Sequence, residues 1–173
     1  MLHLTDDMIE RLVSASEAES VLRSAFIDFA GGRAAMQARA RTEAGGVKLS
    51  TLGAVIPGQG VTGAKVYTTI NGQFRFVILL FSTEDGRPLA CLDAGTITRI
   101  RTAACSLLAA RELAPERPQR MALFGAGVQG SAHAEQFSRA FGLGRIAVCD
   151  PYAKPETIAL LQSRCEAEVD VAS

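Results

Sequence analysis

The sequence predicts an α/β protein, in which a mostly antiparallel α+β domain is followed by the first half of a doubly wound parallel sheet. Three observations lead to this fold class. Apolar residues recur at helical spacing up to Gly31-Gly32 and then alternate with a period of two. Turn dipeptides separate the alternating runs. From Arg120 onward, strand and helix patterns alternate as they do in a βαβ unit.

The first half is expected to open with two helices. Thr5-Asp6-Asp7 begins a short one that ends near Val13, and Ser16 with Glu19 forms a capping box for the second. Strands are then expected at residues 37–43, 47–56, 65–70, 74–81 and 89–92. Asn71-Gly72 between two β-rich runs is a strong hairpin signal. We therefore expect a mostly antiparallel sheet that the two helices can cover.

The second half begins after a long helix that runs from Thr96 through Leu113 and is closed by Pro115 and Pro118. This boundary divides the chain into domains at residues 1–114 and 119–173. The elements expected after it are a strand at 121–124, a helix at 128–141, a strand at 145–150, a helix at 155–167 and the start of a third strand. A doubly wound sheet needs more strands than these. The second domain is therefore expected to be incomplete, and the chain to be an N-terminal portion or a truncated copy of a longer protein.

Composition excludes several classes of protein. The 173 residues carry 18 Lys and Arg against 18 Asp and Glu, which argues against a nucleic-acid partner. No basic start precedes an apolar core at the N-terminus, and the longest apolar run, residues 76–81, is far short of the roughly 20 residues that cross a bilayer. The four Cys lack a C-x-x-C pair, which favours structural thiols over a metal site or disulfides. We expect a soluble, cytoplasmic protein with no membrane partner.

A glycine-rich motif follows the strand predicted at residues 121–124. In Gly125-Ala-Gly127-Val-Gln-Gly130, the first glycine permits a sharp turn, the second lets backbone N–H groups approach a pyrophosphate, and the third allows close helix–strand packing. Asp150 ends the next strand, where its carboxylate can bind a ribose 2′-OH and repel a 2′-phosphate. The pattern predicts a Rossmann-type site for NAD rather than NADP. The alternatives are a glycine turn that binds nothing and an Asp150 that only caps the next turn.

Three cationic positions precede this motif. Lys65 interrupts an otherwise uncharged strand, where it either meets an anion or reaches solvent from an edge strand. Arg101 lies on a helix followed by small residues, where it either binds phosphate or carboxylate oxygens or is solvated. For Arg41 a solvated strand face is the default. We expect the side chains at positions 41, 65 and 101 to converge on one hollow beside the nucleotide site.

Three stretches carry a resemblance to a known family. Residues 93–104, with Ile-Thr and Arg-Thr-Ala-Ala after an acid, match a signature helix, and Gly125–Gly130 followed by His133 matches a nucleotide loop. The other matches, in order and separation, are Arg41-Thr42, Pro57 and Lys65. Over nearly its whole length the sequence resembles the ornithine cyclodeaminase/mu-crystallin family.

The resemblance implies an NAD(P)-dependent oxidoreductase or deaminase of amino-acid metabolism, acting on a small amino or imino acid. It implies that residues 1–114 bind substrate and pair into a homodimer. Arg41 and Lys65 would hold the substrate carboxylate, with Lys65 also catalytic. The cofactor-binding residues that it implies are Arg101, Thr102, Gly125, Gly127, Val128, Gln129, Gly130 and Asp150. No catalytic role falls to His133, which is expected to pack or lie at the surface.

The resemblance leaves two alternatives to an active enzyme. One is a non-catalytic binding protein of the mu-crystallin kind, and the other is an inactive truncated copy. The family's catalytic Asp falls beyond the end of this sequence, so the 173 residues alone are expected to be inactive and to bind NAD weakly or not at all.

Overall fold

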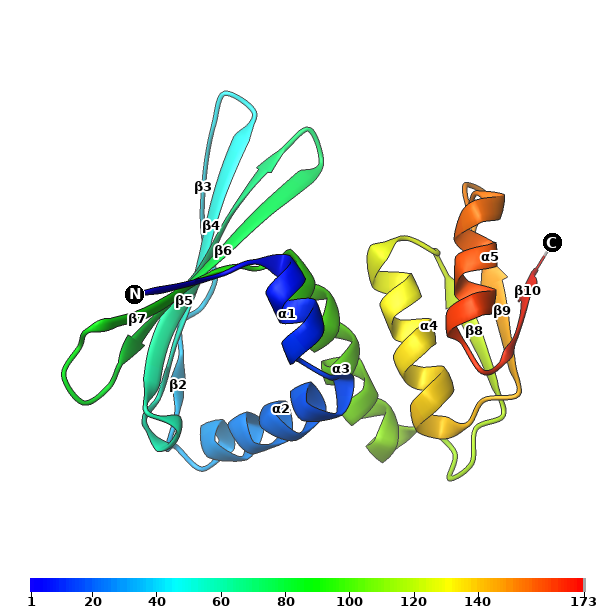
Figure 1. The fold of residues 1–173 in the computed structure, drawn as a ribbon, viewed down its shortest axis with the longest axis horizontal. Helices are drawn as coiled ribbons and strands as arrows, with labels where there is room; N and C mark the ends of the chain where they lie inside the picture. The colour runs from blue at the N-terminus through cyan, green and yellow to red at the C-terminus, as the bar shows by residue number, and fades with distance from the viewer. Residues whose placement is uncertain (173) are drawn as a thin grey trace. The chain divides into compact units, whose positions relative to one another are not determined.

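The structure is a computed structural model that describes residues 1–172. The chain divides into two compact units, Met1–Thr98 and a second one that begins at Arg99. The division falls inside the long helix α3 (Gly95–Leu113), which carries the chain from the first unit into the second (Figure 1).

The first unit is built on a seven-stranded sheet with the order β1-β7-β6-β5-β4-β2, in which β3 also pairs with β4. Its strands are β1 (Leu2–Leu4), β2 (Ala35–Met36), β3 (Ala40–Ala44), β4 (Val47–Ile56), β5 (Val61–Ile70), β6 (Gln73–Ser82) and β7 (Pro88–Asp93). Every pair is antiparallel except β1 with β7. The mostly antiparallel sheet predicted from the alternating pattern is confirmed.

Two tight hairpins project from this sheet (Figure 1). Asn71 and Gly72 join β5 to β6 with φ of 49° and 75°, and Gly45 and Gly46 join β3 to β4 with φ of 56° and 77°. Positive φ at both central positions matches the right-handed twist of the flanking strands, and Asn and Gly adopt it at low cost. The hairpin predicted at Asn71-Gly72 is therefore confirmed.

The helices of the first unit are α1 (Asp6–Leu12) and α2 (Ala15–Ala30), with a short 3₁₀ turn η1 (Pro57–Gln59) between β4 and β5. Ile9 of α1 packs on Ala90 and Leu92 of β7, so α1 covers part of the sheet as expected. The predicted capping box at Ser16 and Glu19 is wrong. Both halves of the box are made two residues earlier, by Ser14 and Glu17, because α1 ends at Leu12 and Ser14 takes the extended conformation of an N-cap.

The strand predictions need three corrections. The strand predicted at 37–43 begins only at Ala40, as β3, and a separate two-residue strand, β2, precedes it; the two pair with different parts of β4. The run 65–70 begins four residues earlier, at Val61, because cross-strand pairing with β4 and β6 extends through the small residues Gly63 and Ala64. β1 was not predicted, since three residues carry too short a pattern and only their pairing with β7 makes them a strand.

The second unit contains a parallel three-stranded sheet in the order β10-β9-β8. After α3 its elements are β8 (Arg120–Phe124), α4 (Val128–Phe141), β9 (Arg145–Cys149), α5 (Pro155–Arg164) and β10 (Glu168–Val171). The order is that of the first three strands of a doubly wound sheet, as the strand–helix alternation predicted. Two strand ends differ from the prediction by one residue, and the last helix differs most, ending at Arg164 instead of residue 167, because the chain extends at Cys165 to reach β10.

The core of the second unit lies between this sheet and its helices. Ile146 and Val148 of β9 are fully buried and pack with Leu123 of β8 and Leu161 of α5. Within the described chain β8 lies at the edge of its sheet, and its last side chain, Phe124, is 81% exposed. The four Cys are free thiols, and no helix in residues 1–172 is long and apolar enough to cross a membrane.

Candidate functional site

A glycine turn joins β8 to α4 at the carboxyl end of the parallel sheet. Gly125 has a φ of 89°, which an L side chain rarely adopts. A Cβ at Gly130 would collide with the carbonyl oxygen of Gly125, whereas a Cβ at Gly127 would meet no atom within 4 Å. The turn thus brings its two ends together tightly and leaves open space above its middle.

The N-terminus of α4 borders that open space. Its N-cap, Gly127, has no side chain to bond the first-turn amides, and Val128 and Gln129 are exposed. The hydroxyl of Ser131 donates to the carbonyl oxygen of Ala126 at 3.1 Å and fixes the turn. Uncapped amides and the helix dipole attract anions. The open Gly127 and these amides fit the pyrophosphate of a dinucleotide.

Asp150 lies just after β9 and is tied to the same turn. Its Oδ2 accepts the backbone N–H of Ala126 at 2.7 Å, and its Oδ1 accepts that of Tyr152 at 2.9 Å. These bonds, led by that from Ala126, hold the pKa of Asp150 below its ordinary value. The carboxylate therefore caps the following turn, as the alternative interpretation had it. A carboxylate offers about four acceptor positions, so others are left for a ribose hydroxyl.

A chain of hydrogen bonds links α3 to the first turn of α4. Ser106 donates from its hydroxyl to the carbonyl oxygen of Thr102 at 3.3 Å, and His133 Nε2 lies 2.9 Å from the same hydroxyl. The other ring nitrogen of His133, Nδ1, donates to the carbonyl oxygen of Gln129 at 2.6 Å. His133 thus connects two predicted cofactor residues, Thr102 and Gln129. Next to Thr102 on α3, the side chain of Arg101 is exposed.

A second cluster lies on one face of the first unit's sheet. Arg41 is directly opposite Ser50, Ser50 is opposite Tyr67, and Tyr67 is opposite Phe76. Directly opposed residues share a face, and so do residues two apart on a strand, which adds Lys65. The sheet thus brings Arg41 and Lys65 to the same face.

Arg41 is connected to a buried pair of hydroxyl groups. Its Nε donates to Ser50 Oγ at 3.1 Å. Ser50 is 1% exposed and Tyr67 is 6% exposed. The hydrogen bond from Ser50 contributes most to holding the pKa of the Tyr67 phenol below its ordinary value of 10, with further lowering by Arg41 and Arg39 and opposition from burial.

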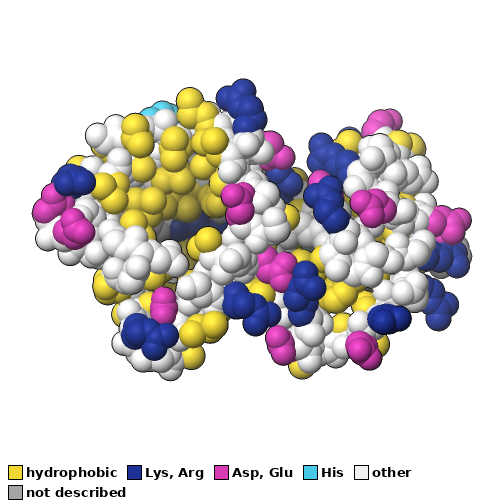
Figure 2. All heavy atoms as spheres, turned by 60° about the horizontal axis from the view of Figure 1, so that its bottom comes forward, with side chains coloured by type: hydrophobic (Ala, Val, Ile, Leu, Met, Phe, Trp, Pro, Cys, Tyr) yellow, Lys and Arg dark blue, Asp and Glu magenta, His cyan; other side chains and the backbone are white. Residues whose placement is uncertain are grey.

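Lys65 lies over two aromatic rings. Its Nζ is 4.9 Å from the ring centroid of Phe76 and 5.4 Å from that of Tyr67, within cation–π range. The edge-strand interpretation of Lys65 is wrong, because β5 has β4 on one side and β6 on the other. Lys65 also borders a hollow of about 230 Å³ lined mainly by apolar side chains from β4, β5 and β6. Figure 2 shows hydrophobic side chains gathered around a hollow in this unit.

The predicted site residues therefore fall into two groups. Arg41 and Lys65 share a face in the first unit, while the glycine turn, Asp150 and Thr102 belong to the second. Arg101 belongs to the second unit too, so its convergence with Arg41 and Lys65 stays a prediction. Sequence reasoning missed Ser50 and Tyr67. Tyr67 lies two residues from Lys65 on the same strand and so shares its face, but only the pairing register places Ser50 and Arg41 there.

The chain matches the ornithine cyclodeaminase/mu-crystallin family over residues 1–173. It is similar to alanine dehydrogenase from Archaeoglobus fulgidus, with 30% identity over 156 residues, which are 86% of this chain and 48% of the relative.

Two solved structures are similar to it over almost all of its length. One is a probable ornithine cyclodeaminase from Bordetella pertussis Tohama I, with 62% identity and a TM-score of 0.97 over 99% of this chain and 55% of that one. The other is an archaeal alanine dehydrogenase dimer with bound NAD, with 27% identity and a TM-score of 0.90 over 100% of this chain and 56% of that one. The chain thus spans about half the length of these relatives.

Proposed function

The chain belongs to the ornithine cyclodeaminase/mu-crystallin family, and we propose that it forms the carboxylate-binding sheet and the nucleotide-binding turn of an NAD-dependent oxidoreductase of amino-acid metabolism. In this proposal residues 1–114 are the substrate-binding and dimerisation domain, and residues 119–173 begin the nucleotide domain. The observation that carries it is the glycine turn, whose open Gly127 adjoins uncapped helix amides.

In the substrate half of the proposal, Arg41 and Lys65 bind the α-carboxylate of a small amino or imino acid. Ser50 accepts the hydrogen bond that the Nε of Arg41 donates. The two terminal guanidinium nitrogens therefore make the two parallel bonds to a carboxylate that Arg geometry favours. Lys65 adds a second positive charge and a proton that it can give or take during the reaction.

In the cofactor half, the amides of Val128, Gln129 and Gly130 bind the pyrophosphate, and Arg101 and Thr102 add contacts to phosphate oxygens. Asp150 accepts a hydrogen bond from the adenosine ribose. Its negative charge disfavours a 2′-phosphate, which favours NAD over NADP. Bound NAD would supply a hydride acceptor or donor at the substrate's α-carbon.

Three related reactions are compatible with this proposal. These are cyclodeamination of ornithine to proline, oxidation of alanine and reduction of a cyclic ketimine. Each needs a carboxylate clamp and a nicotinamide cofactor. The similarity to a probable ornithine cyclodeaminase favours the first, and the similarity to an alanine dehydrogenase the second.

Turnover is the test of this proposal. Purified protein that contains this sequence is incubated with NAD and ornithine or alanine, or with NADH and a cyclic imine, while NAD binding is followed by calorimetry. We expect turnover of at least one substrate. Bound NAD with no turnover of any substrate would favour the binding-protein alternative. For the 173 residues alone we propose no activity and weak NAD binding, which micromolar affinity would refute.

We also propose that the protein forms a homodimer through the sheet. On the face opposite to Lys65, half-exposed apolar side chains come from three neighbouring strands, namely Leu49, Val55, Ile70 and Val77. Exposed apolar faces of this kind favour burial against a partner. Light scattering after gel filtration should give twice the chain mass for the wild type and the chain mass for Leu49→Arg. A wild-type monomer would contradict the proposal.

A further inference from the structure

We propose that Tyr67 is a positioning residue for the substrate carboxylate, because its ring supports Lys65 and its hydroxyl, with Ser50, supports Arg41. The inference rests on the proposed function, since it takes the anion between these cations to be a substrate carboxylate. It assigns a role to Tyr67, a buried residue that the proposed carboxylate clamp does not use.

The hydroxyl of Tyr67 hydrogen-bonds with Ser50 and with Arg41. Ser50 is almost fully buried and opposite Tyr67 in the register, and its Oγ accepts the Nε of Arg41 at 3.1 Å. The bond from Arg41 ends on a neutral hydroxyl, whereas the nearby Lys48 pairs with the carboxylate of Glu43 at 3.4 Å. The guanidinium is therefore fixed in direction while its positive charge stays available to an anion.

The aromatic ring of Tyr67 contacts the ammonium group of Lys65. The Lys65 ammonium lies 5.4 Å from the ring centroid of Tyr67 and 4.9 Å from that of Phe76, and the two ring centroids are 5.3 Å apart. Two adjacent rings attract a cation without neutralising it. The rings thus hold the end of a flexible side chain beside the hydroxyl cluster that fixes Arg41.

One residue consequently orders both cations. Long Lys and Arg side chains lose rotamer freedom when they bind a ligand, and this loss weakens binding unless the side chains are ordered beforehand. Tyr67 provides that order for both, because it is buried and cannot itself move freely. The specific consequence is that a bound carboxylate lies close enough to the phenol to influence its ionisation.

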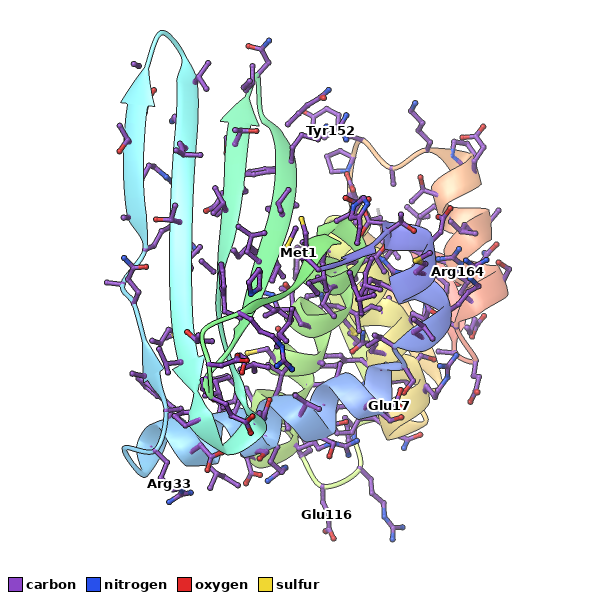
Figure 3. All side chains as sticks on the ribbon, turned by 60° about the vertical axis from the view of Figure 1, so that its left-hand side comes forward. Met1, Glu17, Arg33, Glu116, Tyr152 and Arg164 are labelled. Carbon is purple, nitrogen blue, oxygen red and sulfur yellow. The ribbon has the colours of Figure 1, made fainter. Side chains whose placement is uncertain are left out.

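A titration of Tyr67 tests the proposal directly, because these 173 residues contain no Trp and only two Tyr. The other tyrosine, Tyr152, is 90% exposed (Figure 3). In a Tyr152→Phe background, the near-ultraviolet tyrosinate absorbance that disappears on the further change Tyr67→Phe reports Tyr67. L-proline is the probe, and pyrrolidine, the same ring without the carboxylate, is its control.

L-proline should raise the pKa of Tyr67, because a carboxylate beside Arg41 and Lys65 offsets the positive charge that favours the phenolate. Pyrrolidine should leave the titration unchanged. The Tyr67→Phe variant keeps the ring and should bind L-proline about 3- to 10-fold more weakly. Tyr67→Leu should weaken binding a few-fold further, because the ring is also lost.

Thr68→Val is the matched control, since it removes a hydroxyl from the next residue of β5, which faces the other side of the sheet. It should bind L-proline like the wild type. Wild-type affinity in Tyr67→Phe, or a Tyr67 titration that does not respond to L-proline, would overturn the inference. In protein that contains this sequence, turnover with a KM that Tyr67→Phe leaves unchanged would overturn it too, while leaving the proposed function intact.

Discussion

Replacing Gly130 by alanine separates the two roles that the glycine turn combines. The added Cβ would overlap the carbonyl oxygen of Gly125, which is a backbone atom and cannot rotate away as a side chain could. Overpacking of this kind costs about 1–3 kcal/mol, and a clash with backbone belongs at the upper end. Alanine recovers up to about 1 kcal/mol as the better helix former. The net loss of unfolding free energy for Gly130→Ala is therefore about 2 kcal/mol.

Gly127→Ala is the matched comparison. Gly127 has a φ of −68° and a ψ of −175°, which any residue adopts, and its Cβ would meet no atom within 4 Å. Alanine lowers the conformational entropy of the unfolded chain, which stabilises the fold, but it is a poorer N-cap residue than glycine. Because these effects nearly cancel, the free energy of unfolding should change by less than about 0.5 kcal/mol. The same methyl group would occupy the space proposed for a pyrophosphate, so NAD binding should be lost.

Urea unfolding measures the first effect, and hydrogen exchange of the β8, β9 and β10 amides assigns it to the second unit. Calorimetry with NAD measures the second effect. If Gly130→Ala unfolds at the wild-type urea concentration, the packing argument for this turn is wrong. If Gly127→Ala binds NAD as the wild type does, the open space is not the pyrophosphate site.

Three more predictions follow from single contacts. The pKa of Asp150 is lowered in the folded chain, so the Asp150 carboxylate stabilises the fold fully above its ordinary pKa and less as pH falls through the lowered value. Asp150→Asn should therefore flatten the acid limb of a plot of unfolding free energy against pH. Ser14→Ala should lower the unfolding free energy by about 1 kcal/mol, whereas Ser16→Ala should change it by less than about 0.5 kcal/mol; equal effects in thermal unfolding would contradict the observed capping box. Leu161→Ala should cost about 2–5 kcal/mol in urea unfolding and Leu160→Ala far less, since their exposures are 2% and 47%.

The second unit follows closely from local sequence signals. The strand before Gly125, the helix from Val128 to Phe141 and the strand from Arg145 all carry a period, a turn residue or both. Such signals act over a few residues, so they can be read without knowing the rest of the fold. They are weaker in the first unit, where β1 and the start of β5 exist only because a neighbouring strand pairs with them.

The candidate site, too, was predictable from the sequence only where a local motif carries it. The glycines and Asp150 belong to a short motif whose spacing has a mechanical meaning, and the sequence alone located them. The sequence also marked Lys65 as an unusual charge in an apolar strand. It left open whether that strand was an edge, which pairing on both sides of β5 decided.

By itself, the order of residues determined the alternation of strand and helix, the glycine turn and the chemical types of side chain available for binding. Tertiary structure decided which of those side chains meet. Arg41 reaches Ser50 and Tyr67 across three strands only because β3, β4 and β5 pair in one register. A shift of one residue would turn each side chain to the opposite face. Register depends on contacts between residues far apart in the chain, so no local pattern specifies it.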